Sequence, residues 1–250
     1  MFVCFYLATT FVLGSLRFPF RYWTGLIAVS VATAITIGIW ERGVWALGLF
    51  IPPRIAAREF AIGALWGVAL VGTGAILIVL STDVRHQPGR GFPWLELILV
   101  YAPAALHEEL LFRGYPFQKL LQINRAFALF FVAFLFAALH AGNQAVTPLA
   151  LANVFLGGLL LGLAYERYHH LWFPIGLHLF WNLMSGPILG HEVSGYTGAM
   201  TVFVERGAGP WWLTGGNFGI EGSVWMTVVE LAAIAVLGWQ HMIRSKERLI

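Results

Sequence analysis

The sequence is poor in charge and contains one cysteine, Cys4, and one aspartate, Asp83. A single cysteine excludes a disulfide within this sequence and a metal site built on several thiolates. Lysine and arginine form no run or stripe, which excludes a nucleic-acid partner. We expect Cys4 to pack as a small apolar residue in the first helix, with lipidation as the alternative.

Charged residues make up 11% of the 250 residues and hydrophobic residues 59%, whereas a soluble domain is about 25% charged. The mean hydropathy is +0.76. Because a spanning helix needs about 20 mainly apolar residues, this composition predicts an all-α fold, a polytopic transmembrane helix bundle of about eight helices. The candidate spans are 1–16, 22–40, 60–80, 94–113, 125–141, 147–166, 171–189 and 223–240.

The first span lacks a basic start and a good cleavage signal, so we expect a retained helix rather than a signal peptide. Segment 43–51 ends at a Pro-Pro pair and is interpreted as an interfacial or re-entrant piece. Residues 81–93 are predicted to be a loop. Residues 190–222 are the longest non-spanning stretch, with two tryptophans suited to the membrane interface. No internal repeat divides the sequence, which predicts a single membrane domain over 1–250.

Lysine and arginine are divided unevenly between alternate connections of the predicted spans. One set holds ten: Arg42, Arg54, Arg58, Arg113, Lys119, Arg125, Arg167, Arg244, Lys246 and Arg248. The other set holds five: Arg17, Arg21, Arg85, Arg90 and Arg206. Because cytoplasmic loops carry the excess of these residues, both termini are predicted to be cytoplasmic.

Two adjacent glutamates, Glu108 and Glu109, lie in an otherwise apolar predicted helix, and Arg113 follows. Ionisable groups inside a bilayer are costly and usually functional. Residues four apart share a helix face, so Glu109 and Arg113 can form an ion pair. Glu108 lies about 100° around the helix and stays unpaired, which suits a general base. The alternative is a structural Glu–Arg pair that joins two helices.

His140 lies near the end of the next span and shares a helix face with Phe136. A lone histidine here is also typical of a hydrogen-bonded packing residue. Suppose that the helix that contains Glu108 continues to Gln122 before the chain turns into the next, antiparallel helix. Glu108 and His140 then lie at the same depth in the membrane, each about 22 Å from the turn. The spacing therefore permits contact between the two side chains.

His178 and Asn182 are four apart and present two hydrogen-bonding groups on one helix face. Hydrogen bonding between packed membrane helices is the alternative role for this pair. Asn153 is expected to be a packing residue of that kind. Glu230 needs a partner or access to water, and the sequence does not identify its partner.

Together these motifs resemble the CPBP family, which includes type II CAAX prenyl endopeptidases and bacteriocin-immunity and lysostaphin-resistance-like membrane proteases. The resemblance rests on Glu-Glu-x-x-x-Arg from Glu108, Phe-x-x-x-His from Phe136 and His-x-x-x-Asn from His178, in that order. It covers 94–185, which would be the catalytic core. The N-terminal helices in 1–80 and the C-terminal helix in 223–240 would flank this core.

The resemblance implies hydrolysis of a peptide bond in an intramembrane active-site cavity, by a base for water and donors aimed at the oxyanion. Glu108 and His140 would activate the water. His178 and Asn182 would hold the oxyanion. The supporting residues would be Glu109, Arg113 and Phe136. The implied partners are a membrane-associated protein or peptide substrate and the lipid bilayer.

A metal-dependent mechanism stays open as an alternative. Zinc can be held by three protein ligands with one free position, and these would be Glu108, His140 and His178. Asn182, one helical turn after His178, fits a pair of oxyanion donors better than a pair of ligands. We therefore favour the glutamate mechanism and assign no cofactor.

Other intramembrane protease signatures are absent. His107-Glu108 is followed by Leu111 where His-Glu-x-x-His needs histidine, and Gly-x-Ser-Gly and Gly-x-Gly-Asp are missing. A proton-coupled transporter and a non-catalytic membrane adaptor are the rival functions, because both could use the same buried polar residues. The lack of an internal repeat argues against a carrier, and the intact motifs argue against an adaptor. The predicted location is a bacterial inner membrane.

Overall fold

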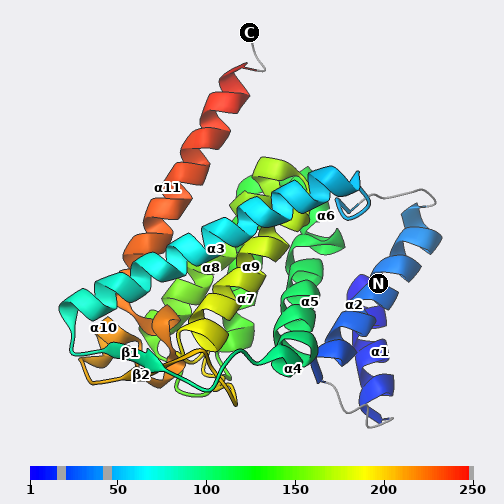
Figure 1. Ribbon diagram of the computed structural model, residues 1–250. Coiled ribbons are helices and arrows are strands. Elements are labelled where there is room, and N and C mark those ends of the chain that lie inside the picture. Colours follow the sequence, from blue (N-terminus) through cyan, green and yellow to red (C-terminus); the bar gives the residue numbers. More distant parts are fainter. Residues whose placement is uncertain (16–20, 42–46, 248–250) are drawn as a thin grey trace.

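The computed structural model describes residues 1–15, 21–41 and 47–247, and it is mainly helical (Figure 1). The α-helices are α1 (Phe2–Ser15), α2 (Arg21–Thr36), α3 (Pro53–Ser81), α4 (Trp94–Glu96), α5 (Ala102–Arg113), α6 (Tyr115–Ile123), α7 (Arg125–His140), α8 (Pro148–Tyr168), α9 (Trp172–Leu183), α10 (Trp211–Thr214) and α11 (Val224–Glu247). The π-helical segments are η1 (Ile37–Glu41), η2 (Leu97–Tyr101) and η3 (Met184–Ile188), and the 3-10 segments are η4 (Gly216–Phe218) and η5 (Ile220–Gly222). The strands are β1 (Arg85–Pro88) and β2 (Phe203–Arg206).

The helices confirm the predicted all-α membrane bundle. In the described part of the chain, three helices are long and apolar enough to cross a membrane: Arg21–Ile39, Pro53–Ser81 and Pro148–Tyr168. Three shorter apolar helices are Phe2–Ser15, Arg125–His140 and Val224–Trp239. The two remaining predicted spans each contain a π-helical segment, because η2 continues into α5 and α9 continues into η3.

Two expectations concern Cys4 and segment 43–51 in the first third of the chain. Cys4 lies on the first helix, α1, as expected, but its side chain is exposed and does not pack against the rest of the described bundle. Residues 43–46 of the proposed re-entrant piece lie outside the described residues, and 47–51 form no helix. Of the residues used to predict orientation, Arg17, Arg42 and Arg248 also lie outside the described residues.

The helix that carries Glu108 ends at Arg113, as the predicted span 94–113 does. α6 begins at Tyr115 as a separate helix, so the continuation to Gln122 on which the depth argument depended is not formed. At Gly114 an added Cβ would lie 2.1 Å from the carbonyl oxygen of Leu110, so only glycine permits this backbone path. The chain then turns as predicted before α7, where the Asn124 side chain accepts a hydrogen bond from the Phe127 amide.

A two-stranded antiparallel sheet covers one end of the bundle, whereas α6 lies at the other end (Figure 1). It pairs β1 with β2 from the two segments predicted to be loops, 81–93 and 190–222. The Nε2 atoms of His86 and His191 lie 3.2 Å apart, and Nδ1 of His191 lies 2.6 Å from Oε2 of Glu205. Burial, and then the neighbouring His191, lower the pKa of His86. A neutral His86 therefore joins the two-stranded sheet to His191 in the chain that follows α9.

Glycines allow α3 and α9 to approach closely. An added Cβ would lie 2.1 Å from the Phe173 carbonyl oxygen at Gly63 and 2.5 Å from the Leu177 carbonyl oxygen at Gly67. On the facing helix, a Cβ at Gly176 would lie 2.2 Å from the Phe60 carbonyl oxygen. Small residues at membrane helix interfaces let backbones meet in this way. Because α9 also carries His178 and Asn182, this interface positions both of those side chains.

We predict that Gly63→Ala destabilises the protein by about 1–3 kcal/mol, because the added methyl group overpacks the interface between α3 and α9. Gly72→Ala is the matched control on α3, since nothing lies within 4 Å of a Cβ at that position. The measurement is the free energy of unfolding in detergent. Equal stabilities for the two variants would contradict the proposed role of this interface.

Candidate active site

A buried chain of polar contacts crosses the interior of the bundle. Nη1 of Arg113 lies 3.1 Å from Oε1 of Glu109, with both side chains fully buried, which confirms the predicted ion pair. Nη2 of Arg113 donates to the Gly158 carbonyl oxygen at 2.9 Å. The same Glu109 oxygen lies 2.7 Å from Nδ1 of His178. The chain therefore joins α5, α8 and α9.

This chain determines which nitrogen of His178 faces outward. Glu109 is paired with Arg113 and acts as an acceptor, so Nδ1 of His178 donates the hydrogen bond between them. Nε2 lies on the other side of the ring, 3.8 Å from Oε2 of Glu108. Because Nδ1 holds one hydrogen, Nε2 can donate only when the ring carries both hydrogens. The ring lies between two carboxylates, which stabilise a positive charge on it.

His140 is oriented by its own helix. Nδ1 lies 2.7 Å from the Phe136 carbonyl oxygen, and because a carbonyl only accepts, Nδ1 carries the hydrogen. Nε2 therefore presents a lone pair. The Phe136 ring lies between the two histidines, with its centroid 4.7 Å from the His140 ring and 6.2 Å from the His178 ring. It also lies 4.9 Å from Cζ of Arg113, close enough for a cation–π contact.

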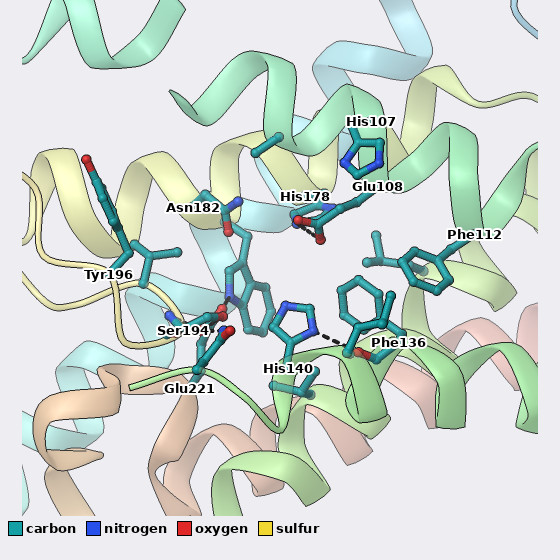
Figure 2. A pocket seen from close by; sticks show the side chains of 18 of the residues that line it. His107, Glu108, Phe112, Phe136, His140, His178, Asn182, Ser194, Tyr196 and Glu221 are labelled. Atoms are coloured by element: carbon teal, nitrogen blue, oxygen red, sulfur yellow. Dashed lines mark hydrogen bonds and ion pairs between the residues drawn. The ribbon is translucent and has the colours of Figure 1, made fainter. Parts of the chain in front are cut away.

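One cavity of about 600 Å³ brings most of the predicted site residues together. Its lining includes Glu108, Phe136, His140, His178 and Asn182. Figure 2 shows Glu108 and His178 on one side of this cavity and His140 across from them. Glu109 and Arg113 do not line it and lie behind His178, as expected for supporting residues. α5, α7 and α9 each contribute side chains, so the cavity is a product of helix packing.

Asn182 lies one turn after His178 on α9 and is 8% exposed. Within the described chain, no hydrogen bond to its side-chain amide is formed, although the amide faces the cavity. A buried amide that is left unbonded is costly. Its donors are therefore available to a molecule in the cavity.

The cavity opens at the end of the bundle that carries the two-stranded sheet. The exposed residues of its lining are Arg21, Leu139, Gly142, Gln144 and Tyr196, which lie in or beside connections at that end. Burial, and then nearby Glu96, raise the pKa of the Tyr196 phenol. Its hydroxyl therefore stays protonated near neutral pH and can donate at the opening.

Sequence reasoning missed Glu221, which lies within the stretch 190–222 that was predicted to be a loop. It is buried and lines the cavity on the same side as His140 (Figure 2). Its Oε1 accepts from Nε1 of Trp181 at 2.8 Å, and its Oε2 accepts from the amide and hydroxyl of Ser194 at 2.8 and 2.6 Å. Glu221 thus holds the chain over the cavity. An acidic residue just before an apolar helix was the available signal.

The two other polar residues noted within apolar spans differ in their surroundings. Asn153 donates to the carbonyl oxygens of Glu221 and Ser223 and accepts from the Thr227 hydroxyl, which confirms a packing role. Glu230 is 2% exposed and lines the cavity. In the described part of the chain, its Oε2 has no hydrogen-bond partner.

The zinc alternative required Glu108, His140 and His178 to act as ligands together. Across residues 1–15, 21–41 and 47–247, no three His, Cys, Asp or Glu side chains are grouped closely enough to hold a metal ion. The three share the cavity without forming such a group, so the arrangement does not fit a three-ligand site. We therefore derive no catalytic step through a metal.

The comparison with protein families matches residues 90–184 to the Rce1-like type II CAAX prenyl endopeptidases. This segment includes all three sequence motifs and confirms the resemblance drawn from them. The comparisons with curated proteins and with solved structures each gave no match. The match covers α4 to α9, the helices that supply Glu108, His140, His178 and Asn182.

We predict that Arg113→Met costs about 3–5 kcal/mol of stability, because it leaves Glu109 as an unpaired buried charge. The double variant Glu109→Gln with Arg113→Met should be more stable than the single variant, since it removes that charge. Unfolding in detergent measures both.

Arg125→Met is the matched control. Arg125 pairs with Glu166 at 2.7 Å, but its side chain is 48% exposed. Although Glu166 is buried, water reaches the arginine, and an ion pair that water screens contributes less than a fully buried one. We therefore expect Arg125→Met to destabilise the protein less than Arg113→Met does. If Arg125→Met were as destabilising as Arg113→Met, the special role of the buried pair would be wrong.

Proposed function

We propose that this chain, with its Rce1-like segment, is an intramembrane endopeptidase. One observation carries the proposal. Glu108, His140, His178 and Asn182, which come from α5, α7 and α9, line a single cavity within an apolar bundle. We further propose that 1–250 acts as one membrane domain and that 94–185 is its catalytic core. The substrate class is a membrane-associated protein or peptide.

In the proposed reaction, a water between Glu108 and His140 attacks the carbonyl carbon of the scissile bond. Glu108 accepts the proton of that water, and Nε2 of His140 accepts the second hydrogen bond and aims the oxygen. The Phe136 carbonyl supports this role, because it keeps the hydrogen of His140 on Nδ1. As the C–N bond breaks, Glu108 returns the proton to the leaving nitrogen.

The developing oxyanion needs donors that are already in place. The Asn182 amide supplies one from the cavity wall. His178 supplies the other from Nε2 when its ring is an imidazolium. Its contacts with Glu109 and Glu108, at 2.7 and 3.8 Å, provide the negative charge that such a cation requires. The buried Arg113–Glu109 pair thus acts on the reaction by orienting His178.

We propose a bacterial inner membrane as the location, with both termini cytoplasmic. Of the described residues in the larger set, Lys119 lies in α6, Arg125 begins α7 and Arg167 lies in the last turn of α8, and cytoplasmic connections carry the excess of lysine and arginine. The exposed residues of the cavity lining lie at the opposite end of the bundle, beside the two-stranded sheet. On this topology, the substrate reaches the cavity from the non-cytoplasmic side.

We predict that Glu108→Ala and His140→Ala each lower peptide cleavage by about 100-fold or more, because a positioned base contributes at least this factor. Asn182→Ala should lower it by about 100- to 1,000-fold, as for the loss of one oxyanion donor. The measurement is cleavage of a quenched peptide library by the purified protein in detergent, with and without a chelator.

Glu166→Gln is the control for this experiment, because Glu166 is a buried carboxylate outside the cavity. It should cleave as the unchanged protein does. Loss of cleavage with chelator would replace the glutamate mechanism by a metal-dependent one. No cleavage by the unchanged protein, together with Glu108-dependent solute uptake by vesicles, would favour the transporter.

The proposed topology predicts opposite labelling of two single-cysteine variants in a Cys4→Ser background. Gln87→Cys lies in β1 of the two-stranded sheet. Ile123→Cys lies at the end of α6, where the native side chain is 78% exposed. In intact bacterial cells, an impermeant maleimide should label Gln87→Cys, whereas Ile123→Cys should need lysis first. The reverse pattern would place the opening of the cavity in the cytoplasm.

A further inference from the structure

The cavity extends beyond the proposed catalytic residues to a closed inner end. Buried residues of α8, α9 and α11 form this end: Asn153, Leu160, Leu161, Trp181 and Glu230. Gly157 faces it from α8. None of these residues takes part in the proposed hydrolysis, so the inner end needs a separate explanation.

Glu230 is the only unbonded acceptor among the acidic and amide side chains of this inner end in the described chain. The residue is 2% exposed, and its Oε2 has no hydrogen-bond partner in the described chain. A Cβ added at Gly157 would lie 3.3 Å from Oε1, so the glycine keeps the space beside the carboxylate free. Glu221 and Asn153 already use their side-chain oxygens for protein donors.

Within the described part of the chain, no cation neutralises this region. Among the described residues, no ion pair involves Glu221 or Glu230, and the arginine in the cavity lining, Arg21, is exposed at the opening. A buried carboxylate is costly unless it is paired and hydrogen-bonded. An occupant with a positive charge and hydrogen-bond donors would supply both.

We infer that the inner end binds a basic side chain, lysine or arginine, of a peptide substrate. This inference rests on the proposed protease function and adds a specificity-determining residue, Glu230. The apolar walls formed by Leu160, Leu161 and Trp181 suit the aliphatic stem of such a side chain, whose charged group reaches the carboxylate. A metal ion fits less well, because a metal ion requires oxygen ligands from several groups. Among the described residues of the inner end, only Glu230 has a free carboxylate oxygen.

The test is a peptide series in which lysine, arginine, norleucine or glutamate occupies each position around one cleaved bond. At one position, lysine or arginine should raise kcat/KM about 10- to 100-fold over norleucine, the range expected for a charge-assisted hydrogen bond. Glu230→Gln should abolish this preference, so that the lysine, arginine and norleucine peptides are cleaved with similar kcat/KM. Glu166→Gln should keep the preference.

A binding measurement separates this inference from catalysis. The inactive Glu108→Ala variant should bind the lysine peptide about 10-fold more tightly than the norleucine peptide, and addition of Glu230→Gln should remove the difference. If Glu230→Gln does not fold, Gly157→Leu is the second variant, because its side chain fills the space beside the Glu230 carboxylate. It should also remove the difference in affinity between the two peptides.

Each result has one meaning. A cleaving protein without a basic preference, or a preference that survives both Glu230→Gln and Gly157→Leu, overturns the inference and leaves the protease function intact. Absence of Glu108-dependent cleavage from the whole series overturns the proposed function itself.

Discussion

The site depends on the buried contact between Arg113, Glu109 and His178. In a bundle with few charges, an arginine and a glutamate without access to water must satisfy each other, and each also holds a third group. Arg113 holds the Gly158 carbonyl of α8, and Glu109 holds the imidazole of α9. Because Glu109 takes the inward face of α5, its neighbour Glu108 is turned by about 100° into the cavity. One ion pair therefore determines both the orientation of a histidine and the exposure of a carboxylate.

Close helix packing supports this arrangement from the other side. The glycines of α3 and α9 bring the two backbones into contact, which places α9 against the bundle with His178, Trp181 and Asn182 directed inward. Trp181 then donates to Glu221, whose other oxygen holds Ser194 across the cavity. The chain after α9 is thus tied to the helix that carries the oxyanion donors proposed above. A change at the α3–α9 interface would reach the cavity through these bonds.

The polar groups of the cavity differ in what remains free. Arg113 and Glu109 pair with each other and do not line the cavity, and both oxygens of Glu221 accept from protein donors. Nε2 of His140, the Asn182 amide and Glu230 keep bonding capacity that faces the cavity. Unused polar capacity is costly in an apolar interior, and where it faces a cavity a ligand can satisfy it. This distinction divides the supporting residues from those proposed to act on the substrate.

Much of the fold could be read from the sequence, because a bilayer demands long apolar segments and these are visible residue by residue. The eight predicted spans coincide with helices, and the spacing of Glu109 and Arg113 specifies their ion pair through the helical period alone. The two-stranded sheet could not be predicted, since β1 and β2 are more than 100 residues apart and pair only where the packing of the helices between them brings them together. The predicted span 94–113 ends where α5 ends, but the separate helix α6 was not predicted, because the backbone path at Gly114 depends on a contact with Leu110.

The sequence by itself determined the membrane class and the residues with chemical capacity. Only the tertiary structure decided which of them share a cavity, which nitrogen of each histidine faces it, and that Glu221 and Glu230 line it as well. Periodicity acts along one helix, whereas a cavity is made by side chains from several.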